Sequence, residues 1–360
     1  MQKNCLNYPV EFVEDAFGDS TVLSDTLKAV TGSERPKVQL IADYNVVQRV
    51  QGLGAKIGRY VQAHGIELAG SPVVMAGGEK IKADSLQSVL KVVMALLEAK
   101  LGKNDAVVAI GGGTLLDVAG YAAAQTRGGV KFVRVPTTPA AMIDAAFAER
   151  AAVDCAVVKD ALSVAAPPSA VVIDTGFAAS VLDGVWRGGI SEAVRLAVVA
   201  SAPFVKKLAG WAESYRTRDL GTLREIVRTA YDVRVKKGGT TLADWAAARL
   251  ESMSGYKLPH GYAMSIGVCV DLAYAEEKGF VKPAERALVM KTLTDCGALD
   301  GLLHSQHLLR QEDDLLLGLD AWRLRNGSPA IELPAGIGKS GREEMPDREV
   351  YRKVFKALVG

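Results

Sequence analysis

The chain has 360 residues and a net charge of only +2 at pH 7, so its charge gives no indication of nucleic-acid or membrane-surface binding. Apolar residues make up 49% of the chain and charged residues 23%, which is typical of a globular protein large enough for two domains. The four cysteines are widely spaced and form no CxxC pair, which predicts free thiols in a reducing compartment. The N-terminal segment has no apolar signal core and no apolar run reaches membrane-spanning length, so we expect a cytoplasmic protein.

Short apolar segments alternate with helical patterns in the first half of the chain. The apolar segments are residues 37–42, 72–76, 106–110, 131–135 and 170–173, and the helical stretches between them are residues 45–64, 84–101 and 114–126. Nearly continuous apolar runs of this length are typical of strands that are buried on both faces. Their alternation with helices predicts a parallel sheet with crossover helices.

The pattern becomes helical after about residue 177. Helical spacing covers residues 189–209, 221–236, 241–254, 260–278, 283–294 and 312–323, without convincing strands. We therefore predict a Rossmann-like α/β domain over residues 1–176 and an all-α domain over residues 177–360. A ligand is expected in a cleft between two such halves.

The most informative motif is the triplet Gly111-Gly112-Gly113, which lies between an apolar strand pattern and a helical pattern. Residues without side chains at this turn allow a ligand to approach the backbone. They also leave the amides of the helix N-terminus free to bind an anion such as a pyrophosphate. Glycine triplets occur in ordinary tight turns as well, so the neighbouring loops decide between the two interpretations.

Polar residues follow four of the predicted strands. These residues include Asp43, Asn45, Glu79, Lys82, Asp117, Thr137 and Thr138. One such loop is more often a plain turn, but the carboxyl ends of parallel strands meet at one edge, so four together favour a ligand site. The GxGxxG pattern is absent, and no acidic residue ends the next strand, which disfavours a standard Rossmann dehydrogenase.

The helical half contains a carboxylate, a second carboxylate and a histidine in apolar surroundings. Glu192, Asp244 and His260 could form a three-ligand metal site with open positions for water or substrate. The alternative is that Glu192 pairs with Arg195 and that His260 is a capping or core residue, which is the more frequent role for a lone histidine. His304 and His307 are interpreted as residues of a solvated helix face.

Five segments together resemble the 3-dehydroquinate synthase-like sugar phosphate cyclases. They are GGGTLLDVAGYAA, KFVRVPTTPAAMIDAAFAERAAVD, VVIDTGFAAS, RGGISEAVR and LPHGYAMSIG, in the family's order and spacing. The resemblance covers nearly the whole chain. It implies an enzyme that uses NAD and a divalent metal, usually zinc, to convert a seven-carbon sugar phosphate to a carbocycle with loss of phosphate. It also implies a homodimer.

The resemblance assigns roles residue by residue. NAD contacts are implied for Asp43, Asn45, Glu79, Lys82, Gly111, Gly112, Gly113, Asp117, Thr137, Thr138, Phe177 and Ser180. Asp144 and Lys159 match residues near the substrate, and Glu192 and His260 match two metal ligands. Arg127 resembles an arginine that is donated to the neighbouring subunit's site.

This chain departs from the family pattern at the metal and substrate positions. Asp244 and Ala248 replace two histidines four residues apart, and Arg150 and Arg195 replace two active-site lysines. Two carboxylates and one imidazole shift the metal preference toward harder ions, so cobalt or manganese is possible beside zinc. Arginine keeps the charge of lysine but does not readily lose a proton. We therefore expect altered specificity.

Two other functions are compatible with these residues. A metal-dependent polyol or glycerol phosphate dehydrogenase would also use a glycine-rich turn and an aspartate ligand. A degenerate homologue would keep the NAD-binding fold without metal or catalysis, which the residues Asp244 and Ala248 suggest. Net production of NADH distinguishes the dehydrogenase, and metal analysis distinguishes the degenerate homologue.

Overall fold

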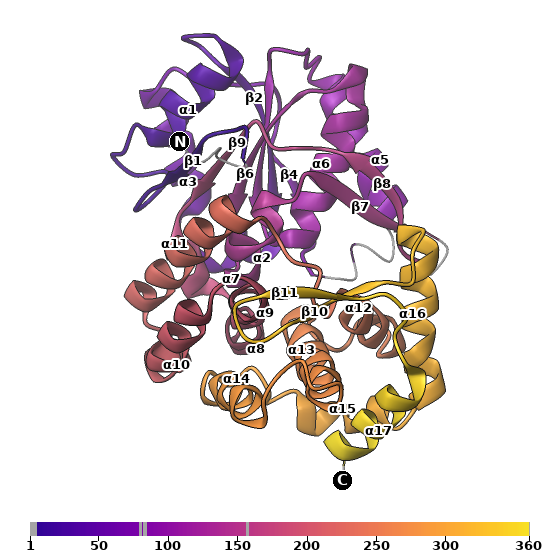
Figure 1. The fold of residues 1–360 in the computed structure, drawn as a ribbon. Helices are drawn as coiled ribbons and strands as arrows, with labels where there is room; N and C mark the ends of the chain where they lie inside the picture. Colours follow the sequence, from indigo (N-terminus) through magenta and orange to yellow (C-terminus); the bar gives the residue numbers. More distant parts are fainter. Residues whose placement is uncertain (1–5, 79–80, 82–84, 156–157, 360) are drawn as a thin grey trace. The chain divides into compact units, whose positions relative to one another are not determined.

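The computed structural model describes residues 6–78, 81, 85–155 and 158–359. Two compact units can be distinguished, one from Leu6 to Val181 and one that starts at Leu182 (Figure 1). Glu79 and Lys82, two of the expected cofactor contacts, lie outside the described residues. In the part of the chain that is described, no helix is both long and apolar enough to cross a bilayer.

A seven-stranded parallel sheet forms the centre of the first unit. Its order is β1-β9-β6-β5-β2-β3, and β4 also pairs with β2. The strands are β1 (Val10–Phe12), β2 (Lys37–Asp43), β3 (Glu67–Leu68), β4 (Val73–Met75), β5 (Ala106–Gly111), β6 (Lys131–Pro136) and β9 (Ala170–Ile173). The five predicted apolar segments correspond to β2, β4, β5, β6 and β9, so the prediction of a parallel α/β fold is confirmed.

Helices cover both faces of this sheet (Figure 1). Ile41, Val107 and Ala109 pack with apolar residues of two helices on one face, while a third helix contacts β5, β6 and β9. The alternation of β-strand side chains explains why every residue of β5 is buried. The helices and turns are α1 (Val22–Thr31), α2 (Tyr44–Arg49), α3 (Leu53–Ala63), α5 (Ser85–Glu98), α6 (Gly113–Gln125), η1 (Thr126–Gly128), α7 (Pro139–Ile143), η2 (Ala145–Phe147) and η3 (Thr175–Ser180).

The strand order places a topological switch point between β2 and β5. The chain runs from β2 to β3 and β4 on one side, and then returns to β5 on the other side of β2. The register aligns Ala42 with Ile110, so Asp43 and Gly111 end two neighbouring strands. Ligands of open α/β sheets bind beyond the carboxyl ends of the strands at such a point.

A hairpin that the sequence analysis did not predict follows the sheet. Its strands β7 (Arg150–Cys155) and β8 (Val158–Ala165) pair antiparallel, and β7 packs against α6. Charged residues interrupt the apolar residues of both strands, and β8 has no fully buried residue, so its sequence lacks the continuous apolar run of the sheet strands. It carries two of the basic residues that the sequence analysis selected.

Arg134 on β6 donates hydrogen bonds to the backbone on both sides of this hairpin. Its Nη1 atom donates to the carbonyl oxygens of Ala145, Ala146 and Ala148 at 3.0, 3.2 and 2.6 Å, and Nη2 donates to Ala166 at 2.9 Å. The side chain is almost fully buried. Burial lowers the pKa of Arg134, and the charge of Asp117 acts in the opposite direction. One guanidinium therefore ties the turn after α7 to the end of the hairpin.

The second unit is helical except for one hairpin, β10 (Ile331–Pro334) with β11 (Ser340–Glu343), which the sequence analysis did not predict. Its helices are α8 (Asp183–Gly188), α9 (Ile190–Ala200), α10 (Ala202–Arg216), α11 (Leu220–Lys237), α12 (Asp244–Met253), α13 (His260–Glu277), α14 (Pro283–Asp295), α15 (Leu302–Leu309), α16 (Glu312–Asn326) and α17 (Arg348–Val359). All residues of α13 from Ala263 to Ala275 are buried. A helix that is apolar all round lies inside its domain, and α13 packs against α8, α9, α12, α14 and α17.

Two glycines allow α8 and α13 to approach at the backbone. A Cβ atom on Gly261 would overlap the carbonyl group of Gly188, and one on Gly188 would lie 3.0 Å from the backbone of Gly261. Gly188 ends α8 just before α9 begins, and Gly261 is the second residue of α13. The contact thus brings the first turns of α9 and α13 together, and with them Glu192 and His260.

We expect Arg134→Met to destabilise the first unit by about 3 kcal/mol, because four buried carbonyl groups lose their donor. Calorimetric unfolding of the full chain measures the effect. The matched control is Arg49→Met, since Arg49 is exposed on α2. Equal melting temperatures for the two variants would contradict this role of Arg134.

Candidate functional site

The carboxyl end of β2 presents Asp43 at the switch point. Its Oδ1 atom accepts the Asn45 backbone N–H at 2.8 Å and the Asn45 side-chain N–H at 3.2 Å. Burial raises the pKa of Asp43, although the bonds from Asn45 act in the opposite direction. A Cβ atom on Gly77 would overlap the Asp43 carboxylate, so Gly77 is needed for this arrangement.

The glycine triplet lies where β5 meets α6. Gly111 is the last residue of β5, Gly112 is the N-cap of α6, and Gly113 is the first helical residue. A Cβ atom on Gly112 would lie 3.3 Å from Thr138, and one on Gly113 would lie 3.1 Å from Ala145. The turn is therefore packed closely against the β6–α7 loop, and the amides at the start of α6 lie beside it.

Thr137 and Thr138 follow β6 at the same edge of the sheet. The Thr137 N–H donates to the Gly111 carbonyl at 3.0 Å, and the Thr138 hydroxyl accepts the Ala141 N–H as the N-cap of α7. The Thr137 Oγ1 atom is buried and has no hydrogen-bond partner among the described residues. A buried hydroxyl beside a helix N-terminus fits a bound polar group such as a nucleotide phosphate.

Three further residues of the first unit have structural contacts. Phe177 is buried and packs edge-on against Phe17, with ring centroids 6.4 Å apart. Ser180 donates from its hydroxyl to the Phe177 carbonyl at 2.8 Å. Asp144 lies at the junction of α7 and η2, and its carbonyl accepts the Phe147 N–H. Their implied roles toward cofactor and substrate stay predictions.

Arg150 and Lys159 lie at opposite ends of the β7–β8 hairpin. Arg150 is exposed, pairs with Ala165 in the ladder, and donates from Nε to the Ser163 hydroxyl at 2.9 Å. Lys159 lies near the turn, next to Asp160, whose N–H binds Asp154. Asp154 is four positions beyond Arg150 along β7, which is about 13 Å of strand. The two cations therefore lie at separate places on the hairpin.

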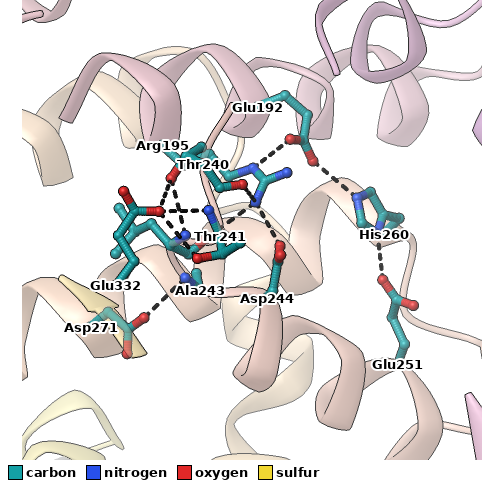
Figure 2. Close-up of polar contacts among 11 residues, drawn as sticks. Glu192, Arg195, Thr240, Thr241, Ala243, Asp244, Glu251, His260, Asp271 and Glu332 are labelled. Carbon is teal, nitrogen blue, oxygen red and sulfur yellow. Dashed lines mark hydrogen bonds and ion pairs between the residues drawn. The ribbon is translucent and has the colours of Figure 1, made fainter. Parts of the chain in front are cut away.

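A buried network of charges surrounds Arg195 in the second unit (Figure 2). The Arg195 Nε atom lies 2.5 Å from Glu192 Oε2, and Nη1 lies 2.6 Å from Asp244 Oδ1. Nη1 also lies 3.3 Å from the carbonyl oxygen of Thr240 and 3.4 Å from that of Leu242. The side chains of Arg195 and Glu192 are only 4% and 1% exposed, so solvent contributes little to the balance of charge between them.

His260 connects Glu192 to a third carboxylate (Figure 2). Its Nε2 atom lies 3.0 Å from Glu192 Oε1, and its Nδ1 atom lies 2.5 Å from Glu251 Oε1. Both ring nitrogens therefore face carboxylate oxygens, and a cation between Nε2 and Glu192 would also suit this arrangement.

Glu192 and His260 fit a divalent metal, whereas Asp244 is turned elsewhere. Nitrogen and oxygen ligands about 2.1 Å from one ion lie about 3.0–3.4 Å apart, which matches the spacing of His260 and Glu192. Glu251 holds Nδ1 as carboxylates commonly do for metal-binding histidines. Asp244 pairs with Arg195 instead, and no group of three His, Cys, Asp or Glu in the described ranges is arranged to hold a metal ion.

Two carboxylates, a buried one on α13 and a partly exposed one on β10, fix the segment that leads to Asp244 (Figure 2). Glu332 on β10 accepts from the Thr240 hydroxyl at 2.8 Å and from the Thr241 N–H at 2.6 Å. Asp271 on α13 is fully buried, and three donors face its carboxylate. Burial raises the pKa of Asp271 to about 7, and these donors act in the opposite direction.

Sequence analysis missed Glu251, Asp271 and Glu332. The signal for the first two was present, because each is a carboxylate within a helix of mostly apolar residues, as is Glu192. Such a group needs a buried partner. Glu332 lies in a hairpin that was not predicted, and it is adjacent to Thr240 only in the folded chain.

Known proteins are similar in sequence to most of the chain. Residues 72–185 match the family model described as 3-dehydroquinate synthase N-terminal. The 3-dehydroquinate synthase of Pyrobaculum aerophilum is 30% identical over 258 residues, which are 66% of this chain and 74% of that protein. The 2-epi-5-epi-valiolone synthase of an Actinoplanes species is 26% identical over 356 residues, covering 92% and 86% of the two chains.

A solved structure has the same fold. The 2-epi-5-epi-valiolone synthase of Streptomyces hygroscopicus subsp. jinggangensis, with NAD+ and Zn2+ bound, superposes with a TM-score of 0.83. The two chains are 23% identical, and the match covers 98% of this chain and 97% of that chain. The two-domain fold expected from the sequence is thereby confirmed.

We expect Arg195→Met to lower the free energy of unfolding by about 3–5 kcal/mol, because the positive charge that Glu192 and Asp244 share is removed. Thermal unfolding of chelator-treated protein measures the loss. The control is Arg348→Met, since the Arg348–Asp320 pair is more than 40% exposed and should contribute less than about 1 kcal/mol. Similar losses in both variants would show that the Arg195 network does not depend on charge balance.

Proposed function

Because the chain belongs to the 3-dehydroquinate synthase family, we propose that it is an NAD- and divalent-metal-dependent sugar phosphate cyclase. It would convert a seven-carbon sugar phosphate to a carbocycle with elimination of phosphate, which makes it a carbon–oxygen lyase, and its substrate would differ from dehydroquinate synthase's. The observation that carries this proposal is the pair Glu192–His260, with Glu251 bound to the other nitrogen of the imidazole, in a member of this family. Asp244 and Ala248, in place of two histidines, support the altered specificity.

The strand-end residues of the first unit would bind NAD. The glycine triplet and the N-terminus of α6 suit the pyrophosphate, and the buried Thr137 hydroxyl suits a phosphate oxygen. Asp43 could accept from ribose hydroxyls, as strand-end carboxylates do in other dinucleotide sites. Asp117, Thr138, Phe177 and Ser180 remain proposed contacts from the resemblance.

Glu192 and His260 would hold the metal, with Asp244 as third ligand once its carboxylate leaves Arg195. The donor set suits zinc, and two carboxylates with one imidazole also admit cobalt or manganese. When bound, NAD would accept and later return one hydride, and the metal would acidify the hydroxyl on the carbon that gives up this hydride. Arg195, freed from Asp244, would then hold a negatively charged group of the substrate.

The other charged residues would orient the substrate. Lys159 and Arg150 lie far apart on the hairpin, so they would bind different groups, one of them the phosphate. Asp144 would contact substrate hydroxyls. A homodimer is proposed from the resemblance, and α5 supports it with an apolar face in which Leu90 and Met94 are 60% and 55% exposed.

The test is an assay with seven-carbon sugar phosphates, NAD and zinc, cobalt or manganese. We expect release of phosphate without accumulation of NADH, and a loss of at least 100-fold in His260→Ala but none in His307→Ala, whose side chain is exposed on α15. Steady NADH production from a polyol would support a dehydrogenase instead. Neither phosphate nor NADH with any of these substrates would leave the degenerate homologue as the correct interpretation.

We also expect Gly77→Ala to weaken NAD+ binding by roughly tenfold, because the added methyl group displaces the Asp43 carboxylate. Isothermal titration with NAD+ measures the dissociation constant without any need for turnover. The matched control is Gly58→Ala in α3, where a Cβ atom meets nothing within 4 Å. Unchanged affinity in Gly77→Ala would remove Asp43 from the cofactor site.

A further inference from the structure

Asp271 contacts both chain neighbours of Asp244. Its Oδ2 atom accepts the Ala243 backbone N–H at 3.0 Å, and its Oδ1 atom accepts the Trp245 indole N–H at 3.1 Å. Ala243 and Trp245 precede and follow Asp244 directly. One carboxylate on α13 therefore fixes the chain on both sides of Asp244.

The backbone before Asp244 is held in a conformation that it would not adopt alone. Ala243 has φ +71°, in the left-handed region that costs an L residue about 1 kcal/mol or more. Earlier in the same segment, Thr240 and Thr241 both donate hydrogen bonds to Glu332. These contacts leave Asp244 little freedom beyond rotation of its side chain.

Burial of a carboxylate at position 271 lowers the stability of the folded protein. It lies fully buried within α13, and no basic side chain donates a hydrogen bond to it in the described structure. An apolar residue would fill the same place without the desolvation cost, but it would release Ala243 and Trp245. The contacts with Ala243 and Trp245 therefore explain why a carboxylate is present at this buried position.

We infer that Asp271 is a positioning residue that holds the backbone at Asp244, so that this carboxylate reaches Arg195 in the structure and would reach the ion held by Glu192 and His260 in the proposed function. Its importance for catalysis rests on the proposed function, whereas its effect on residues 240–245 does not. An amide at this position keeps the shape of the side chain, but its NH2 group must face at least one of the three donors. Asp271→Asn is therefore a sharp test of the carboxylate.

The matched control is Tyr351→Phe. The Tyr351 hydroxyl donates to the same Oδ1 atom at 2.8 Å, whereas the Ala243 backbone N–H donates to the other oxygen, Oδ2. The phenyl ring of the variant retains the packing against Trp245, whose ring centroid lies 5.0 Å away. Both variants remove one buried hydrogen bond of Asp271 or more, so a general loss of stability should appear in both.

Hydrogen–deuterium exchange of the full chain measures how firmly residues 240–245 are held. We expect Asp271→Asn to accelerate exchange of these amides at least tenfold, and Tyr351→Phe to change it less than twofold. Titration of chelator-treated protein with Co2+ gives the second readout. We expect about tenfold weaker affinity in Asp271→Asn only, the size typical of residues that support a metal ligand.

Unchanged exchange in Asp271→Asn, or equal acceleration in both variants, would overturn the inference. Faster exchange with unchanged Co2+ affinity would overturn the link between this segment and the metal. If the wild-type protein binds no Co2+, the metal part of the proposed function fails, and the exchange data alone still decide whether Asp271 holds the segment.

Discussion

The charge balance around Arg195 is the interaction on which the second unit's candidate site depends. One guanidinium serves Glu192 and Asp244, and Glu192 in turn faces His260. Each of these groups would be costly to bury alone, but the network keeps them in one place. In the proposed function, a metal that took Glu192 and Asp244 would have to compete with the guanidinium of Arg195. Its affinity would then depend on the conformation of Arg195.

In the first unit, the candidate site is formed by short loops that the sheet brings together. Its parallel strands end at one edge, and the switch between β2 and β5 opens a place for a ligand there. The loops are packed so closely that Gly77 and the glycine triplet have no space for side chains without displacement. The close approach of the loop backbones is thus as important for this candidate site as its polar side chains.

Much of the fold could be predicted from the sequence because burial determines the pattern of apolar residues. Strands β2, β5, β6 and β9 are buried over nearly their whole length, and α13 is apolar all round. The β7–β8 hairpin was missed because β8 is partly exposed along its length, and the β10–β11 hairpin because its strands have only four residues each. The pairing of these strands depends on packing in the folded chain, which the strand preference of the individual residues does not reveal.

The site was predictable only where local rules apply. The strand-end residues follow from topology, and Glu192 and His260 were selected for their apolar surroundings. The pairing of Asp244 with Arg195 could not be foreseen, because it depends on Asp271 and Glu332, which are 27 and 88 residues away in the sequence. The two interpretations of Glu192, as metal ligand or as partner of Arg195, are compatible. Its Oε2 atom binds Arg195, and its Oε1 atom faces His260.

The backbone contact between Gly188 and Gly261 has a consequence for motion. With no side chain between them, the end of α8 and the start of α13 pack backbone to backbone, and Glu192 lies in the first turn of α9, which follows α8. The contact therefore limits how far the backbone segments that carry Glu192 and His260 can move apart. An opening of this contact would separate the two side chains, so the Glu192–His260 pair depends on the packing of the surrounding helices.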